Sequence, residues 1–168
     1  MSRILMVVAA ERFRDEELFL TREVLEGHGH EVTLASTKTG KLQGSRGGSA
    51  EAEKTLDVVT DDGFAAVVFV GGGGSKQLWN DVDAQRLARR FFDAEKVVGA
   101  ICLAPVILAR AGVLAGKAAT VTGTEAKTIE AAGARYMGPG VTVDGRVVTA
   151  NAPKASRAFA EAIASAIG

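Results

Sequence analysis

The chain has a single cysteine, Cys102, placed where a thiol can act as a nucleophile. It follows the apolar run Val97–Ile101, which is typical of a buried parallel strand, and it precedes Pro105, which suits the first turn of a helix. Open α/β sheets bind ligands at the carboxyl ends of their strands, and a strand–turn–helix junction can expose a nucleophile there. The N-terminus of the following helix favours a thiolate. We therefore expect an activated thiol, although a lone cysteine is often only a small buried apolar residue.

A glycine-rich turn offers a second chemical feature. Gly71 to Gly74 follow another apolar run, Ala65–Val70. Backbone amides of such a turn can form an anion-binding concavity, and with the amide of Leu103 they can hold an oxyanion. The segment is not a Walker phosphate loop, because Ser75 precedes Lys76 where that motif needs glycine. A flexible turn without a ligand is the alternative that the pattern leaves open.

An acidic segment, Phe13 to Leu18, follows the first apolar run and opens a predicted helix. Acidic residues in a first helical turn usually lie in solvent and interact with the helix dipole, as we expect for Asp15 and Glu16. One carboxylate of this segment that turns toward the end of the sheet can contact the thiol.

The elements that must position these groups alternate between strand and helix. Such alternation predicts an α/β fold with right-handed crossovers, a mostly parallel central sheet and helices on both faces. No linker divides the chain, so we expect one domain over residues 1–168. The glycine-rich segment Lys38 to Ala50 is predicted to be an exposed loop. The expected strands are Ile4–Ala9, Val32–Ala35, Ala65–Val70, Val97–Ile101 and the hairpin Val141–Val143 with Arg146–Thr149; the expected helices are Asp15–Glu26, Asp81–Ala94, Pro105–Ala111 and Pro153–Ile167.

Charge and composition narrow the possible partners. The chain has 20 basic and 20 acidic residues, which gives no reason to expect nucleic acid or an anionic membrane as partner and little repulsion against self-association. No apolar stretch is long enough to span a membrane. Met1 to Ala10 fits a buried first strand better than a signal peptide, because charged residues follow it where a cleavage site would need small ones. With one cysteine no intrachain disulfide is possible, and we expect a cytoplasmic protein.

The same segments, in this order, resemble the ThiJ/PfpI superfamily, also called the DJ-one superfamily, over nearly the whole chain. The resemblance is carried by the acidic segment, the Gly27 to Val32 turn, the Val70-Gly71-Gly72 turn and the Ala100 to Pro105 element. The Ala111 to Lys117 segment and the Val143-Asp144-Gly145 hairpin complete it.

The resemblance implies a flavodoxin-like three-layer sandwich that forms a dimer or a larger homo-oligomer. By position, Cys102 matches the family's reactive cysteine, and Glu17 matches a buried glutamate whose protonated carboxyl contacts that sulfur. Gly71 and Gly72, with the amide of Leu103, match the expected oxyanion-binding groups. The implied activities include glyoxalase or deglycase chemistry on reactive carbonyls, proteolysis, chaperone activity and oxidative-stress sensing, with no metal or organic cofactor.

The chain departs from the family pattern at three places. Leu103 stands where the protease-like branch has histidine, Gly123 stands where another branch has histidine, and Ala150-Asn151-Ala152 replaces a Ser-Arg-Gly segment. The chain's two histidines, His28 and His30, are expected at the opposite end of the sheet from Cys102, as polar turn residues. A Cys-His hydrolase on the usual pattern is therefore unsupported.

Three functional hypotheses follow. The first is a stress-protective, cysteine-dependent enzyme that acts on small reactive carbonyls, or on protein side chains modified by them, with Glu17 moving protons at a pKa raised by burial. The second is a non-catalytic redox sensor or chaperone-like dimer, since a low-pKa thiol oxidises readily. The third is an intracellular cysteine peptidase of the PfpI type, which needs Glu17 or a second subunit as its base.

Overall fold

A seven-stranded sheet forms the centre of the molecule. The computed structural model describes residues 1–168. All neighbouring strands of this sheet are parallel except the first pair, which is an antiparallel hairpin at one edge. In spatial order the strands are β11 (Val141–Asp144), β12 (Val147–Ala150), β8 (Val97–Ile101), β7 (Ala66–Phe69), β1 (Arg3–Val7), β3 (Glu31–Ser36) and β6 (Lys54–Thr55).

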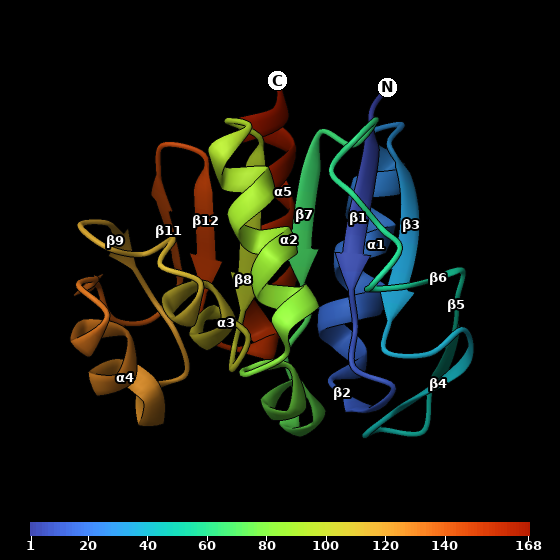
Figure 1. The fold of residues 1–168 in the computed structure, drawn as a ribbon, viewed down its shortest axis with the longest axis horizontal. Coiled ribbons are helices and arrows are strands. Elements are labelled where there is room, and N and C mark those ends of the chain that lie inside the picture. Colours follow the sequence, from blue (N-terminus) through green and yellow to red (C-terminus); the bar gives the residue numbers. More distant parts are fainter.

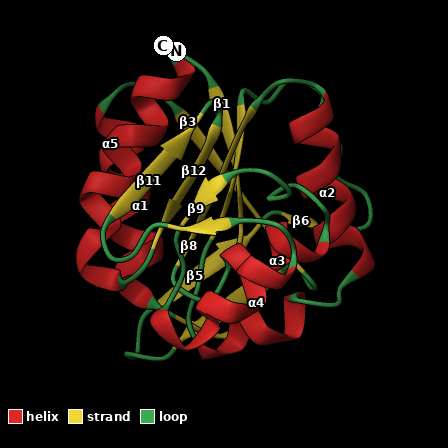
Figure 2. Cartoon of the chain, turned by 90° about the vertical axis from the view of Figure 1, so that its left-hand side faces the viewer, coloured by secondary structure: helices red, strands yellow, loops and turns green.

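Helices cover both faces of this sheet, which confirms the predicted three-layer α/β sandwich. In Figure 1 the sheet lies between one helix layer in front and another behind, and Figure 2 shows the layers from the side. None of the helices has both the length and the apolar character needed to cross a bilayer. The rear layer is α1 (Asp15–Gly27) and α5 (Ser156–Ile167); the front layer is α2 (Val82–Asp93) and α3 (Pro105–Arg110), with α4 (Ala126–Ala131) beside α3.

The core consists of two apolar clusters, one on each face of the sheet. One holds 28 buried residues beneath α2 and α3, and the other holds 20 beneath α1 and α5. Along β1, Leu5 and Val7 belong to the first cluster, whereas Ile4 and Met6 belong to the second. Because every strand residue meets apolar neighbours on one face or the other, the parallel strands have continuous apolar sequences rather than alternating ones.

The chain reverses direction across the sheet between β1 and β7. From β1 the chain runs through α1 to β3 on one side, and from β7 it runs through α2 to β8 on the other. In doubly wound sheets, ligands bind outside the carboxyl ends of the strands at such a switch point. The residues that follow β1, β7 and β8 therefore converge at one edge, the lower edge in Figure 1.

Two small sheets lie outside the central one. One of them includes most of the segment Lys38 to Ala50, so the prediction that this segment is an exposed loop was wrong. This segment forms most of an antiparallel hairpin whose first strand also pairs with the chain just after β1. Leu42 in the hairpin is fully buried, so its glycines serve turns and close packing rather than a free loop. The small sheets are β2 (Glu11–Phe13) with β4 (Gly40–Gly44) and β5 (Ser49–Ala52), and β9 (Ala118–Ala119) with β10 (Arg135–Tyr136).

Asp15 fastens this hairpin to the start of α1, so the expectation that it merely faces solvent was wrong. Its Oδ1 accepts a hydrogen bond from the amide of Arg46 at 2.9 Å, and its Oδ2 accepts one from the amide of Gly48 at 2.7 Å. Two bonds from backbone amides to one carboxylate hold the turn against the helix. Glu16, by contrast, stays partly exposed and pairs with Arg14 at 2.9 Å.

Gly99 lets α5 approach β8 closely and provides a test of this packing. A Cβ atom at this position would lie 2.9 Å from Ile163 Cδ1 and 3.2 Å from Phe159 Cζ, both on α5. We expect Gly99→Val to lower the free energy of unfolding by about 2–3 kcal/mol through overpacking, measured by denaturant titration. Gly27→Ala is the control, because no atom lies within 4 Å of its added Cβ. Equal stabilities of the two variants would contradict this account.

Candidate functional site

Cys102 lies immediately after β8, in the predicted turn between strand and helix. Its φ of +66° is in the left-handed region, which a residue with a side chain seldom adopts. Its amide donates to the carbonyl of Ala150 at 2.8 Å, and its carbonyl accepts from the amide of Thr122 at 2.8 Å. Neighbours on two sides thus hold the strained backbone in place. The thiol is partly buried, so it lies at the surface of the site rather than sealed in the core.

Glu17 lies in the first turn of α1, and its side chain is fully buried. Its Oε1 accepts a hydrogen bond from the amide of Gly71 at 2.9 Å. Its Oε2 is buried and has no nitrogen or oxygen partner. The thiol of Cys102 is the group beside it, and each affects the ionisation of the other. The structure therefore brings together the acid and the thiol that were predicted from separate parts of the sequence.

The surroundings of Glu17 favour its neutral form. Burial raises the pKa of this carboxyl to about 8, against the lowering effects of the Cys102 thiol and the Gly71 amide. A buried carboxylate would leave Oε2 charged and without a partner, which is costly. A protonated carboxyl instead carries an O–H group, and the thiol of Cys102 is the neighbouring polar group that interacts with it. The geometry thus suits a carboxylic acid at neutral pH.

The pKa of the Cys102 thiol is raised, whereas the dipole of the following helix alone predicts that it is lowered. Burial, followed by the negative charge of an ionised Glu17, raises the pKa of Cys102 to about 11. α3 has only six residues, and its dipole does not outweigh these effects. The repulsion between two anions disappears when Glu17 keeps its proton. Both groups therefore hold their protons at neutral pH, and the sulfur can carry a negative charge only while Glu17 is neutral.

Thr122 is a site residue that the sequence analysis missed. Its hydroxyl lies 3.1 Å from Cys102 Sγ and 3.3 Å from the carbonyl of Asn151. Donation to sulfur stabilises a thiolate, and this bond lowers the pKa of Cys102. With one hydrogen for two acceptors, the hydroxyl can favour the sulfur when the thiol ionises. The only sequence signal was a β-branched run that ends at Gly123.

The glycine turn supplies backbone groups at close range. A Cβ on Gly71 would lie 2.5 Å from both Glu17 Oε1 and the carbonyl oxygen of Ile101, so only glycine fits between the acid and the thiol turn. Gly72 has a φ of +104°, and its amide faces the sulfur and lowers the pKa of Cys102. The amides of Gly72 and Leu103 donate to no backbone acceptor. The Gly71 amide differs from the sequence-based expectation, since its hydrogen is committed to Glu17.

Trp79 links the glycine turn to the thiol turn. Its indole Nε1 donates to the carbonyl of Leu103 at 2.9 Å. The ring comes from the C-terminal end of the 3₁₀ helix Gly73–Leu78, so it fixes the turn after β7 against the turn after β8. This bond uses the carbonyl of Leu103 and leaves its amide free. Two further 3₁₀ segments, Gly123–Glu125 and Pro153–Ala155, lie near the same edge.

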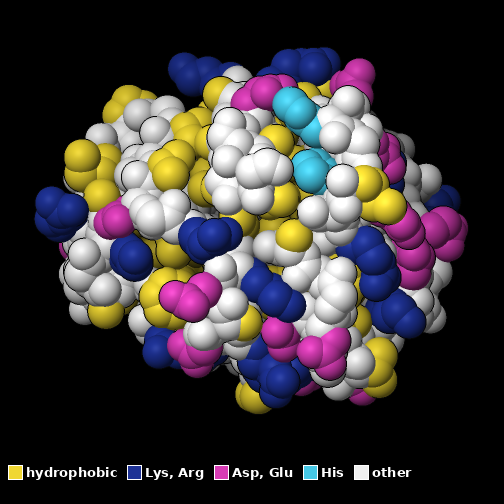
Figure 3. Space-filling model, turned by 90° about the horizontal axis from the view of Figure 1, so that it is seen from above, with side chains coloured by type: hydrophobic (Ala, Val, Ile, Leu, Met, Phe, Trp, Pro, Cys, Tyr) yellow, Lys and Arg dark blue, Asp and Glu magenta, His cyan; other side chains and the backbone are white.

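Both histidines lie at the opposite end of the sheet, as predicted. His30 Nδ1 accepts a hydrogen bond from the amide of Ser2 at 3.1 Å, just before β1 begins. His28 pairs with Glu161 of α5 at 3.1 Å. Figure 3 shows the two rings, in cyan, on the end that carries the chain termini. No histidine of this chain is therefore available as a base for Cys102.

The chain is similar to known proteins both in sequence and in fold. The model of the DJ-1/PfpI family matches residues 2–166. The uncharacterized protein MJ0967 of Methanocaldococcus jannaschii is 46% identical over 99% of this chain and 82% of its own length. The deglycase PfpI of Pyrococcus furiosus is 35% identical over 89% of this chain and 90% of its own length. The crystal structure of a ThiJ/PfpI domain protein from Brachyspira murdochii superposes with a TM-score of 0.95 at 35% identity, covering 98% of this chain and 95% of that one.

The hydroxyl of Thr122 can be tested by removing it without changing the side-chain shape. We expect Thr122→Val to slow alkylation of Cys102 by iodoacetamide at pH 7 by on the order of tenfold, because a hydrogen bond to a charged sulfur is lost. Thr122→Ser should restore most of the rate. Thr128→Val on α4 is the control, since that hydroxyl bonds only Glu125. A normal rate in Thr122→Val would show that the hydroxyl does not stabilise the thiolate.

The raised pKa of Glu17 predicts a pH-dependent stability. The unfolded chain loses this proton near pH 4.5, whereas the folded chain keeps it to about pH 8. Between these values the free energy of unfolding should fall as pH rises, by at most roughly 1.4 kcal/mol per pH unit. Below pH 4.5 the carboxyl is protonated in both states, so its titration does not change the free energy of unfolding. Above pH 8 the loss of stability is complete.

Glu17→Gln imitates the neutral acid and should remove this decline. The measurement is the difference in free energy of unfolding between native protein and variant at pH 5, 6, 7 and 8, which cancels the titration of all other groups. Glu26→Gln, an exposed position on the same helix, is the control. A pH-independent difference for Glu17→Gln would mean that Glu17 is ionised in the folded protein.

Proposed function

The chain belongs to the DJ-1/PfpI family, and from this premise we propose that it is a cysteine-dependent enzyme acting on reactive carbonyl compounds and their adducts on proteins. Cys102 is the nucleophile and Glu17 is the group that moves protons. One observation carries the proposal: a fully buried carboxyl with an unpartnered oxygen lies beside a partly exposed thiol. The likeness to a protein named as a deglycase supports the carbonyl class of substrate.

The first step is addition of sulfur to an aldehyde carbon. The partly exposed Cys102 thiol loses its proton to solvent as its sulfur forms the carbon–sulfur bond, and the π electron pair of the carbonyl moves to oxygen. The amides of Gly72 and Leu103, which donate to no backbone acceptor, are the proposed donors to the developing oxyanion. Glu17 then gives its proton to that oxygen, which leaves a neutral hemithioacetal and a carboxylate. A buried carboxylate is unfavourable, so Glu17 is at that moment a stronger base than it would be in water.

The second step uses this base. For a 2-oxoaldehyde such as methylglyoxal, Glu17 takes the proton from the hemithioacetal carbon and returns it to the neighbouring carbon, while a hydroxyl proton moves between the two oxygens. The aldehyde carbon is oxidised and its neighbour is reduced, so no external oxidant is required. The product is a thioester of a 2-hydroxy acid, and water hydrolyses it to release lactate and the thiol. No organic cofactor enters these steps.

Other roles for the thiol are less well supported by the same geometry. A redox sensor reacts with peroxide as a thiolate, but burial raises the pKa of Cys102 to about 11. A peptidase needs a base that both activates the nucleophile and protonates an amine, and the chain's histidines lie at the wrong end of the sheet. Self-association and a cytoplasmic location remain predictions from sequence.

The activity test is steady-state conversion of methylglyoxal to lactate. We expect Cys102→Ser to reduce the rate to background, and Glu17→Gln to reduce kcat by on the order of a hundredfold or more, as for loss of a general acid–base group. Glu26→Gln should retain the native rate. Equal rates for the native protein and Cys102→Ser would overturn the proposal. An inactive native protein whose Cys102 gains oxygen in mild peroxide, seen by mass spectrometry, would support the sensor role instead.

A further inference from the structure

A cleft of about 520 Å³ lies between the start of α1 and the segment before α5, and three of its seven lining residues are cationic. The cationic side chains come from Arg14, Lys154 and Arg157, and Glu16 is the one acidic residue that lines it. Ala152, another lining residue, follows Asn151, whose carbonyl lies 3.3 Å from the Thr122 hydroxyl that contacts sulfur. The cleft is therefore lined by residues next in sequence to Asn151 and to Glu17, on the same side of the sheet as the thiol, and its lining carries a net positive charge.

Arg14 is held rigidly and retains free donors. Its Nε and Nη2 bond the carboxylate of Glu16 at 2.9 to 3.2 Å, which fixes the guanidinium in one orientation. Its Nη1 makes no hydrogen bond to the protein, so two N–H groups remain for a ligand. The Arg14 charge acts on both Glu17 and Cys102, which places it close to the reacting pair.

Lys154 contributes a second unpaired cation. It is exposed, it lines the same cleft, and no carboxylate lies within ion-pair distance of its Nζ. Arg157, in contrast, already pairs with Glu23 at 3.2 Å. Two cations with unused donors, from the start of α1 and from the turn before α5, thus face one cleft. Neutral carbonyl compounds such as methylglyoxal have no group that uses them.

We propose that Arg14 and Lys154 form an anion subsite, so that the enzyme prefers carbonyl compounds that carry a carboxylate or phosphate group over neutral ones. The carbonyl oxygen would face the Gly72 and Leu103 amides, and the anionic group would bind the cations of the cleft. This inference rests on the proposed function for the reaction itself. The subsite can nevertheless be tested on the thiol alone, without turnover.

The test compares two alkylating agents that differ only in charge. Iodoacetate and iodoacetamide react at the same carbon, but iodoacetate carries a carboxylate where iodoacetamide carries a neutral amide. We expect Arg14→Gln and Lys154→Gln each to lower the ratio of their rate constants at Cys102 by roughly threefold, as suits a partly exposed charge. Higher salt should reduce the native ratio in the same direction. Because both reagents report on one thiolate, a change in its pKa cancels in the ratio.

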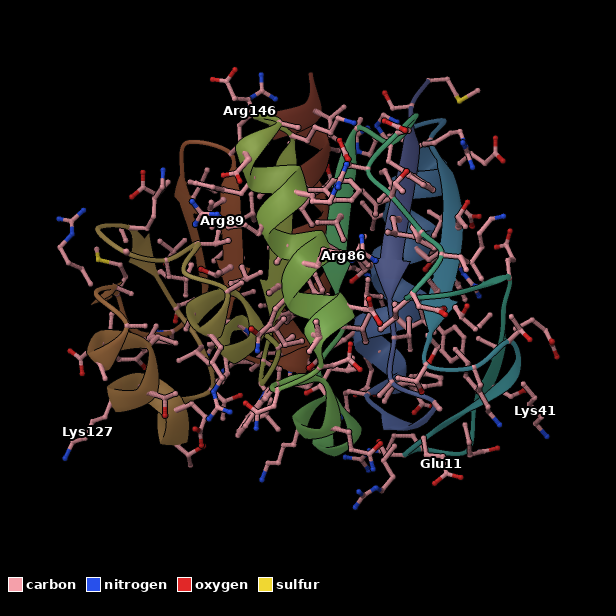
Figure 4. The ribbon with its side chains drawn as sticks, in the orientation of Figure 1. Glu11, Lys41, Arg86, Arg89, Lys127 and Arg146 are labelled. Carbon is pink, nitrogen blue, oxygen red and sulfur yellow. The ribbon has the colours of Figure 1, made fainter.

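Lys127→Gln is the matched control. Lys127 projects into solvent from α4 at the far lower left of Figure 4. Its substitution by glutamine therefore removes the same charge at a place away from the cleft. Arg14→Lys keeps the charge and should restore much of the ratio. If Arg14→Gln does not fold, the exposed Lys154→Gln variant tests the subsite by itself. A ratio unchanged in Lys154→Gln, or lowered equally by Lys127→Gln, would overturn the proposal.

The outcomes separate the two proposals. A charge-dependent ratio in a protein that does not convert methylglyoxal would retain the anion subsite and reject the proposed reaction on that substrate. Conversion of methylglyoxal with a charge-independent ratio would retain the reaction and reject the subsite. As a second readout, glyoxylate should protect Cys102 from iodoacetamide at lower concentration than methylglyoxal does, and Lys154→Gln should weaken that protection.

Discussion

The whole site depends on one hydrogen bond, from the amide of Gly71 to Glu17 Oε1 at 2.9 Å, and on the burial that leaves the other carboxyl oxygen without a polar partner. Burial of this kind favours the neutral form of the carboxyl, and the thiol of Cys102 is the polar group beside it. The charge state of the thiol is therefore decided by an acid on a different element. Cys102 and Glu17 do not ionise independently, because a negative charge on either one raises the pKa of the other.

The topology explains why these two groups meet. The acid follows β1 and β2, the glycine follows β7 and the thiol follows β8, and the chain reverses direction across the sheet between β1 and β7. The reversal leaves space at one edge of an otherwise filled sheet. Gly71 and Gly72 occupy that space with backbone only, since a Cβ on Gly71 would overlap both the acid and the Ile101 carbonyl. The lack of side chains there permits the acid and the thiol to approach.

The sequence predicted the strands that are covered by helices on both faces of the sheet. β1, β7 and β8 have continuous apolar sequences because both faces of the sheet are covered, and this pattern revealed the sheet and the turn of Cys102. It was uninformative where contacts are distant in sequence. Asp15 resembles any acidic residue at a helix start, yet it binds the amides of Arg46 and Gly48. The hairpin of β4 and β5 was mistaken for a loop for the same reason, because Leu42, its large buried apolar residue, stands among glycines and polar residues in the sequence.

The direction in which the pKa of Cys102 shifts could not be predicted from the helix that follows it. Desolvation and the charge of Glu17 both raise this pKa, whereas the helix dipole lowers it. The partner that does favour ionisation, Thr122, comes from the segment between β9 and the 3₁₀ turn Gly123–Glu125, 20 residues further along the chain. Arg14 completes this arrangement from the opposite side: its amide donates to the carbonyl of Gly71 at 3.0 Å, while the amide of Gly71 binds Glu17. One glycine thus fixes both the proton-bearing acid and the cation at the cleft. Gly71 therefore positions both the arginine proposed to select an anionic substrate and the acid proposed to move its proton. A change in the backbone at this glycine should affect substrate binding and the chemical step together.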